Sequence, residues 1–327
     1  MVSEERFLEV RNMKTHFHTP EGVVRAVDGV SFHINRCETL ALVGESGCGK
    51  TVTSLSLIRL LPATAAVSAD FFRVGDKEIL ELTDAEARSI RGSTVSMIFQ
   101  EPMTSLNPLF RIDRQLGEVF YLHNPKISSF EVRRRSLDVL RKVGIPNPEE
   151  RLRVYPHQLS GGLRQRVMIA ISLAADPQLL IADEPTTALD VTIQAQIIDL
   201  LKKLQQDMNM SILLITHDFG VVSQMADRVA VMYAGKIVEE GSLEAIFSDP
   251  WHPYTQLLIL SIPGIKVTRG NRLEAIKGTV PNPLNYPEGC RFAPRCPYAM
   301  NICVRMEPEE YAEGDRRVSC FLKGNGS

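Results

Sequence analysis

The sequence lacks a run of about 18 consecutive apolar residues, the length that a membrane-spanning helix requires. Its longest apolar stretch, residues 167–182, is interrupted by Asp176, Pro177 and Gln178. The first residues are acidic rather than basic, and no apolar core follows them as it would in a signal peptide. We therefore expect the chain to remain in the cytoplasm, where docking on a membrane protein is still open to it.

A large charge of one sign is also missing. Lys and Arg number 37 against 39 Asp and Glu, for a formal net charge of -2. Such a balance creates no general basic field for nucleic acid or anionic lipid. The 327 residues show no internal repeat and no low-complexity tract, and they suffice for one large domain or two unequal ones.

The sequence has six cysteines but no Cys-x2-Cys pair of the kind common in zinc sites. Four of them gather near the C-terminus, at Cys290, Cys296, Cys303 and Cys320. In a reducing compartment this clustering favours metal chemistry over disulfides. Four thiolates can complete a tetrahedral zinc site or hold an iron–sulfur cluster, and free cysteines are the third alternative.

The sequence does contain a complete phosphate-binding pattern, G-x-x-x-x-G-K-[ST], at Gly44–Thr51. An apolar run precedes it and a helical pattern over residues 51–61 follows, which is the strand–loop–helix context that such a loop requires. Glycines permit the curl that aims backbone N–H groups at phosphates, and the helix dipole adds positive potential. Lys50 is expected to reach the β and γ phosphates, and the hydroxyl of Thr51 to bind Mg²⁺.

A second apolar strand, predicted at residues 179–182, ends in two acids. Asp183 is placed to hold Mg²⁺ through water, and Glu184 to polarise an attacking water as general base. Upstream, Ser160-Gly161-Gly162 caps a predicted helix over residues 160–175 and offers a hydroxyl and free N–H groups to an anion.

Further patterns complete the predicted fold. Alternating residues over 8–17 and 23–34 indicate antiparallel strands, and short apolar runs at 95–99, 212–215 and 229–232 indicate buried strands. Helical stretches separate the buried runs, notably residues 193–206. The fold class is therefore α/β: a P-loop NTPase core with a mostly parallel sheet, an antiparallel β subdomain, a helical insert at about 105–165 and a cysteine-rich C-terminal appendix.

In this order the motifs resemble the ATP-binding cassette (ABC) family from about Leu8 to Pro263. The resemblance implies that the Ser-Gly-Gly turn of one subunit closes over ATP held by the phosphate loop of another. It assigns Gln100 to Mg²⁺ or the lytic water and His217 to the γ-phosphate. In the chain's own ATP site, Phe17 is expected to stack on the adenine. The other expected contacts in that site are Gly44, Ser46, Gly47, Cys48, Gly49, Lys50, Thr51 and Val52. Across the dimer, the expected contacts with the partner's ATP are Ser160, Gly161, Gly162, Gln165 and Asp190.

Several stretches are similar to one subclass, the oligopeptide/dipeptide importer ATPases, and most of all to the first ATPase of the pair. They are residues 100–108, 155–158, 183–194 and 252–255. The resemblance implies an ATP-hydrolysing subunit at the cytoplasmic face of the membrane, with a second homologous ATPase and two membrane permease subunits as partners. An external peptide-binding protein would act indirectly, and no nucleic acid is expected. The alternatives are a soluble ABC ATPase acting on ribosomes or nucleic acid, and an importer ATPase for another small solute such as nickel complexes.

The same resemblance divides the chain into a nucleotide-binding domain, residues 1–261, and a C-terminal transporter-type region, residues 262–327. For the four C-terminal cysteines it favours a 4Fe-4S cluster, with zinc as the alternative. Two positions depart from the subclass. Cys37 stands where Gly is usual, and Cys48 where Ser is more common. Both are expected to be neutral, with sensitivity of the phosphate loop to thiol reagents as the alternative at Cys48.

Overall fold

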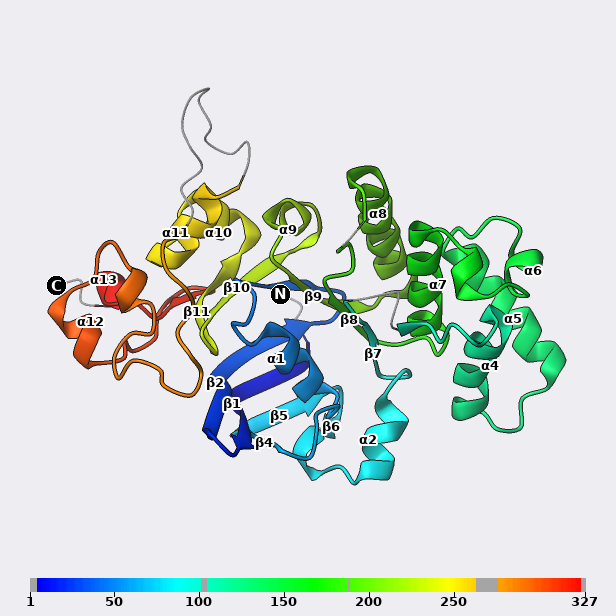
Figure 1. Ribbon diagram of the computed structural model, residues 1–327, viewed down its shortest axis with the longest axis horizontal. Helices are drawn as coiled ribbons and strands as arrows, with labels where there is room; N and C mark the ends of the chain where they lie inside the picture. The colour runs from blue at the N-terminus through cyan, green and yellow to red at the C-terminus, as the bar shows by residue number, and fades with distance from the viewer. Residues whose placement is uncertain (1–4, 101–104, 188, 263–275, 325–327) are drawn as a thin grey trace. The chain divides into compact units, whose positions relative to one another are not determined.

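The structure is a computed structural model that describes residues 5–100, 105–187, 189–262 and 276–324. The chain divides into two compact units, coloured along the sequence in Figure 1. The first unit comprises residues 1–5, 35–38 and 81–214, and the second unit residues 6–34, 39–80 and 215–327. The predicted boundary between residues 261 and 262 stays a prediction, because residues 263–275 lie outside the described residues.

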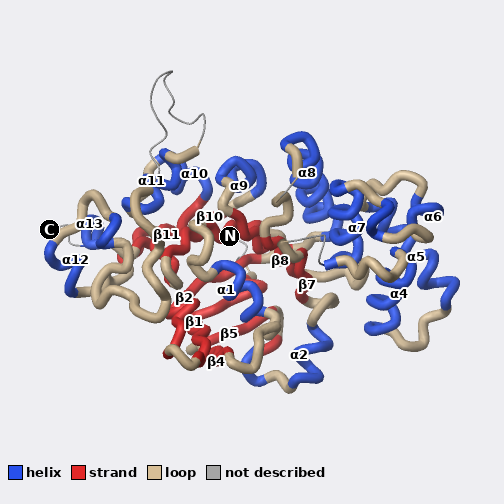
Figure 2. The backbone as a smooth tube through the Cα atoms, in the orientation of Figure 1, coloured by secondary structure: helices blue, strands red, loops and turns tan. Residues whose placement is uncertain are grey.

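The second unit contains the predicted antiparallel subdomain. Two long strands, β1 (Arg6–Thr19) and β2 (Gly22–Asn35), pair with each other, and the sheet runs β2-β1-β5-β6, with β4 also paired to β1. The short strands are β4 (Ala65–Ser68), β5 (Phe71–Val74) and β6 (Lys77–Glu78). Burial alternates along β2, as expected for a sheet with one face on the core. Figure 2 shows these strands side by side in red.

The other strands of the second unit place the phosphate-binding pattern. β3 (Thr39–Val43) is buried at every residue and pairs in parallel with β10 (Arg228–Tyr233), as strands covered on both faces do. β10 turns back antiparallel into β11 (Lys236–Ser242) through Ala234 and Gly235, both with positive φ, as a two-residue hairpin turn needs. α1 (Lys50–Leu57) follows β3 through the glycine-rich loop. Helices α9 (Phe219–Met225), α10 (Leu243–Ser248) and α11 (Pro253–Leu260) belong to the same unit.

The cysteine-rich appendix continues this sheet. It contains α12 (Asn301–Arg305), β12 (Tyr311–Glu313), β13 (Arg316–Val318) and α13 (Phe321–Gly324). β13 pairs antiparallel with β11 and with β12. Arg317 forms an ion pair with buried Glu240, which holds the appendix on β11 as well.

The first unit carries the acidic strand. β7 (Val95–Ile98) pairs in parallel with β8 (Leu179–Asp183), and β9 (Ser211–Thr216) follows β8 in the sheet order. The flanking helices are α2 (Asp84–Ile90), which begins in a capping box of Thr83 and Glu86, α7 (Gly161–Leu173) and α8 (Val191–Met208). The buried strands β3 and β7–β10 lie where the apolar runs predicted them.

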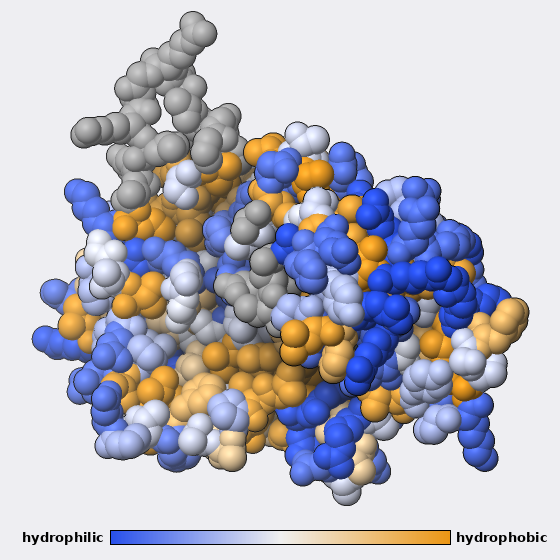
Figure 3. Space-filling model, turned by 45° about the vertical axis from the view of Figure 1, so that its right-hand side comes forward, coloured by the Kyte–Doolittle hydropathy of each residue, from blue (hydrophilic) through white to orange (hydrophobic). Residues whose placement is uncertain are grey.

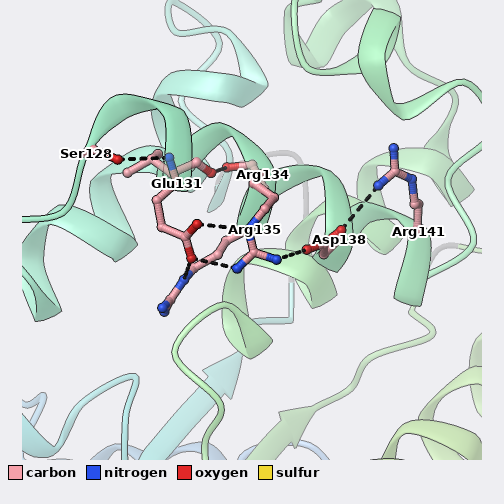
Figure 4. A network of polar contacts seen from close by, with 8 residues as sticks. Ser128, Glu131, Arg134, Arg135, Asp138 and Arg141 are labelled. Carbon is pink, nitrogen blue, oxygen red and sulfur yellow. Dashed lines mark hydrogen bonds and ion pairs between the residues drawn. The ribbon is translucent and has the colours of Figure 1, made fainter.

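The predicted helical insert is formed by α4 (Ile112–His123), α5 (Ser129–Lys142) and α6 (Pro148–Arg151). Its apolar face buries Leu116, Phe120 and Leu140. The outward face of α5 is charged: Ser128 caps it, and Glu131, Arg134, Arg135, Asp138 and Arg141 form a network of ion pairs (Figure 4). Figure 3 accordingly shows mostly hydrophilic side chains over this part of the chain, with single apolar ones between them. Within the described residues, every helix is too short or too polar to span a lipid bilayer.

Candidate functional site

The loop between β3 and α1 has a geometry that only glycine permits at two positions. A Cβ atom at Gly44 (φ 154°) would lie 2.1 Å from the carbonyl oxygen of Met232, and one at Gly49 (φ 109°) 2.4 Å from that of Ala26. Real Cβ atoms do not approach so closely, so a side chain at either position would displace backbone. The glycines therefore pack the loop against β10 and β2 while its outer residues, Ser46 and Gly47, stay exposed.

Lys50 is held by the loop that precedes it. Its Nζ donates hydrogen bonds to the carbonyl oxygens of Gly44, at 2.7 Å, and Glu45, at 2.9 Å. Gly49 is the N-cap of α1 and provides no side-chain hydrogen bond, so the first-turn N–H groups face a region where an anion can bind. Thr51 is exposed and Val52 half-buried in the same turn. A fixed ammonium group beside free N–H groups is the chemistry that holds a triphosphate.

The thiol of Cys48 is buried beneath this loop. Burial raises the pKa of Cys48 above its ordinary value, against the opposing effect of the Lys50 charge. A buried, protonated thiol is a poor nucleophile. The expected sensitivity of the loop to thiol reagents is therefore not favoured in this conformation.

In the first unit, Asp183 ends β8 as a buried residue, and Glu184 follows it with a φ of 47°. This left-handed conformation is costly for a residue with a side chain, and such strain gathers at functional sites. The carboxylate Oε2 of Glu184 accepts hydrogen bonds from Nε2 of Gln100, at 2.9 Å, and from the hydroxyl of Thr187, at 2.8 Å. The structure thus brings together two residues that the sequence predicted as catalytic.

The start of α7 presents the Ser-Gly-Gly turn. Ser160 is exposed, and its hydroxyl accepts a hydrogen bond of 3.4 Å from the N–H of Leu163 as the N-cap. Gly161 is exposed as well. A Cβ atom at Gly162 would lie 3.0 Å from the side chain of Ile193 in the first turn of α8. The two helix starts therefore lie side by side.

Asp190 caps α8 by accepting a hydrogen bond of 3.0 Å from the N–H of Ile193. Asp190 is exposed, whereas Gln165 is buried and donates from Nε2 to the carbonyl oxygen of Pro185 at 2.6 Å. That bond ties α7 to the loop after Glu184. The surface formed by Ser160, Gly161 and Asp190 is thus anchored to the acidic edge of β8 through Gln165.

The two remaining predicted contacts are His217 and Phe17. His217 is exposed and follows β9, and Phe17 is half-buried in β1, paired with Ala65 across to β4. Both belong to the second unit, as the phosphate loop does. Their predicted contacts with the γ-phosphate and the adenine stay predictions, as does Mg²⁺ binding by Thr51, Gln100 and Asp183.

The four C-terminal cysteines line one small cavity of about 20 Å³ in the second unit, together with His252 and Phe292 among others. All are free of disulfides. Burial raises the pKa of the thiols of Cys290, Cys296 and Cys320, that of Cys320 to about 11. In the part of the chain that the structure describes, no three His, Cys, Asp or Glu residues are arranged to hold a metal ion.

Sequence reasoning missed the residues that surround Glu45, the second residue of the phosphate loop. Its N–H donates to the hydroxyl of Tyr254 at 2.9 Å, and its carboxylate forms an ion pair with Arg295. Both partners stand in stretches that the sequence singled out, residues 252–255 and the segment around Cys296. Their position beside the loop is visible only in the fold.

Two family models match the chain: "ABC transporter" over residues 27–187 and "Oligopeptide/dipeptide transporter, C-terminal region" over residues 238–303. The chain is 52% identical over 317 residues to the oligopeptide transport ATP-binding protein AppD of Bacillus subtilis (strain 168), covering 96% of each chain. It is 50% identical over 323 residues to the dipeptide transport ATP-binding protein DppD of the same organism, covering 98% of this chain and 95% of that protein.

Among solved structures, a dimeric ATP-binding cassette in a post-hydrolysis state with ADP and Pi matches with a TM-score of 0.62 and 27% identity. The match covers 72% of this chain and 98% of that one. The sequence identity, its coverage and the shared fold agree with one another. The chain belongs to the ABC transporter family.

Proposed function

We propose that the chain is the ATP-binding and ATP-hydrolysing subunit that powers import of di- or oligopeptides through a membrane ABC transporter. The observation that carries the proposal is Glu184, strained in a left-handed conformation at the end of a buried strand and oriented by Gln100 and Thr187. A carboxylate fixed in this way suits a general base that must hold one water in line for attack. The names of the relatives, which are oligopeptide and dipeptide transport ATP-binding proteins, support peptides as the cargo.

In the proposed mechanism, the loop at 44–51 cradles the phosphates and Lys50 neutralises the β and γ oxygens. Thr51, Gln100 and Asp183 would hold Mg²⁺ when it is bound, and the ion would supply positive charge for the transferring phosphoryl group. Glu184 takes a proton from the attacking water, and His217 contacts the γ-phosphate. Phe17 stacks on the adenine.

ATP binding is completed by a second copy of the same surfaces. Ser160, Gly161 and Asp190 form an exposed surface at two adjacent helix starts, and helix N-termini bind phosphate readily. We propose that this surface contacts ATP held by a homologous ATPase, with Gln165 supporting it from behind. ATP then shifts the equilibrium toward the closed dimer by the difference between its binding free energies to the closed and the open state. Hydrolysis removes this difference, and the dimer opens.

The proposed partners follow from this role: a second ABC ATPase, two membrane permease subunits and, indirectly, an external peptide-binding protein. The chain would lie peripherally at the cytoplasmic face of the membrane. Motion would pass to the permeases through the region around Gln100 and the helical insert.

The test is the substitution Glu184→Gln in the assembled transporter. Loss of a general base lowers the rate by about 10²–10⁴-fold. We expect hydrolysis at this chain's own site to fall by at least about 100-fold while ATP binding is kept, because the amide preserves the size of the side chain and can still contact Gln100 and Thr187. Near-normal turnover would refute Glu184 as the base.

We also propose that Cys290, Cys296, Cys303 and Cys320 hold a 4Fe-4S cluster that keeps the appendix together. In support, all four line one cavity, and burial raises the pKa of the thiols of Cys290, Cys296 and Cys320, so that a bound metal must displace their protons. A single zinc ion needs its four sulfurs about 3.8 Å apart, from Zn–S bonds of about 2.3 Å. A 4Fe-4S cluster is held by four thiolates, each bound to a different iron atom.

Protein purified without oxygen should show a broad visible absorbance and about four iron atoms per chain, and Cys320→Ser should lose both. Stoichiometric zinc in place of iron would favour the alternative. A colourless, metal-free protein with four titratable thiols in the appendix would refute both kinds of site.

A further inference from the structure

The phosphate loop contains an acid that plays no part in the function proposed above. Glu45 stands within the stretch that is expected to receive a triphosphate. A carboxylate beside so concentrated an anion is unfavourable unless its charge is balanced. The structure supplies that balance from a residue 250 positions away in the sequence.

Arg295 engages Glu45 with both arms of its guanidinium. Nη1 donates to Oε2 at 2.6 Å and Nη2 to Oε1 at 2.9 Å, a bidentate geometry that is among the strongest ion pairs in proteins. The side chain of Arg295 is only 4% exposed, and that of Glu45 29%. Tyr233 also accepts from Arg295 at 3.3 Å, and the carbonyl oxygen of Lys277 accepts at 2.9 Å. Arg295 is therefore fixed within the appendix while it holds the loop.

Glu45 in turn is fixed at three points. Its carboxylate binds Arg295, its N–H donates to the hydroxyl of Tyr254, and its carbonyl oxygen accepts from Nζ of Lys50 at 2.9 Å. A continuous chain of contacts thus runs from Arg295 through Glu45 to the ammonium group of Lys50. All of these residues belong to the second unit.

We infer that Arg295 is a positioning residue for nucleotide binding: it neutralises Glu45 and fixes the loop carbonyl that orients Lys50. The C-terminal appendix is then a working part of the ATP site, and the "ABC transporter" model, which ends at residue 187, does not include it. The inference rests on the proposed function in that it takes the loop at 44–51 to bind ATP.

The test is the affinity of the purified full-length chain for Mg²⁺-ATP, measured by displacement of trinitrophenyl-ATP. A hydrogen bond to a charged group is among the stronger ones in proteins, and a tenfold change in affinity corresponds to about 1.4 kcal/mol. We expect Arg295→Met to raise the Kd for ATP by about tenfold. The defect should shrink at high salt, because the exposed carboxylate's repulsion of the phosphates is then screened.

Two further variants separate positioning from mere structural support. The double variant Arg295→Met with Glu45→Gln should recover affinity to within about threefold of wild type, since the uncompensated charge is gone. Arg291→Met is the matched control. Arg291 is about as buried, at 6% exposure, and anchors the same segment through Asp28 and the carbonyl oxygen of Ala234, but it does not pair with Glu45. It should lower the melting temperature and leave the Kd for ATP unchanged.

Wild-type protein that fails to bind Mg²⁺-ATP would overturn the proposed function itself. Wild-type binding with an unchanged Kd in Arg295→Met would overturn only the role of Arg295. The role of Arg295 would also be overturned if Arg291→Met weakened ATP binding as strongly and adding Glu45→Gln to Arg295→Met did not restore the affinity. The appendix would then affect ATP binding only through the general stability of the protein.

Discussion

At the scale of single residues, positive φ angles identify positions where the chain tolerates an unfavourable backbone conformation. Cys37 has a φ of 60°, and Glu184 one of 47°. Each conformation costs about 1 kcal/mol or more for a residue with a side chain. At position 37 a glycine would adopt this conformation without that cost, and the Sγ of Cys37 lies 3.4 Å from the carbonyl oxygen of Asn209. At Glu184 glycine could not replace the carboxylate that Gln100 and Thr187 orient.

A buried histidine makes stability depend on pH. His252 is fully buried, and burial lowers its pKa from 6.5 to about 3. Between these values the unfolded chain binds a proton that the folded chain excludes, so the unfolded state is favoured as pH falls. We expect the free energy of unfolding to decrease by about 1.4 kcal/mol per pH unit well below pH 6.5, measured by urea unfolding at pH 7, 6 and 5.

The matched variant is His252→Asn, whose side-chain oxygen can still accept the N–H of Tyr254 as Nδ1 of His252 does, at 3.0 Å. His252→Asn should reduce the slope of the free energy of unfolding against pH by about 1.4 kcal/mol per pH unit. The control His18→Asn changes an exposed histidine and should leave this slope unchanged. Equal slopes in wild type and His252→Asn would show that other groups cause the acid destabilisation.

The residues of the candidate site differ in how far sequence could predict them. The loop at 44–51, Asp183, Glu184 and Ser160 follow from local patterns, because each depends on its neighbours in the chain. The pair of Glu45 and Arg295 could not be predicted, since it joins positions 250 residues apart and neither side chain forms part of a local motif. Contacts of this kind appear only when the fold brings distant segments together.

At the scale of elements, burial decides which strands can be predicted. β3 and β8 are apolar runs buried at nearly every residue, so composition indicates them directly. β11 was not predicted, because it contains Glu239 and Glu240, which sequence alone suggests are exposed. Both are buried at 1% exposure: Arg317 and Arg228 form ion pairs with Glu240, and backbone N–H groups donate to Glu239. The buried carboxylates of β11 are thus balanced by partners from other segments of the chain, which sequence alone does not reveal.

Two helix starts offer a matched test of the proposed contact across the dimer. Ser160 caps α7 and Ser128 caps α5, each by accepting one backbone N–H, and loss of such a cap costs about 1 kcal/mol. Ser160→Ala and Ser128→Ala should therefore lower the free energy of unfolding similarly. Under the proposed function, only Ser160→Ala should also reduce ATP hydrolysis, by about tenfold or more at the site on the partner ATPase, because it removes a hydroxyl proposed to donate to phosphate there.

The measurements are chemical unfolding of the isolated chain and phosphate release by the complex. If Ser128→Ala impairs phosphate release as strongly, the effect of Ser160 is one of helix stability. If neither variant changes it, the turn at 160–162 does not contact nucleotide.

At the scale of the whole molecule, the functional residues fall into two groups with different proposed roles. Under the proposed function, the phosphate loop and the acidic edge serve the chain's own ATP, whereas Ser160, Gly161 and Asp190 serve the ATP of the partner ATPase. Gln165 donates a hydrogen bond to the carbonyl oxygen of Pro185, beside Glu184, and so links α7 to the acidic edge within the first unit. Under the proposed function, one chain contributes to two separate ATP sites in an assembled importer.

This division predicts how substitutions combine. Lys50→Ala should disable the site on this chain, and Ser160→Ala the site on the partner ATPase. Combined in one chain, they should abolish ATP hydrolysis by the complex, because both sites are then incomplete. Ser160→Ala combined with loss of the phosphate-loop lysine of the partner ATPase should be no worse than the latter alone, because both changes fall on one site and are not additive. Phosphate release by complexes purified with each combination distinguishes the patterns. The reverse pattern, in which Ser160→Ala adds nothing to Lys50→Ala in the same chain, would place both residues in one site and exclude the shared clamp.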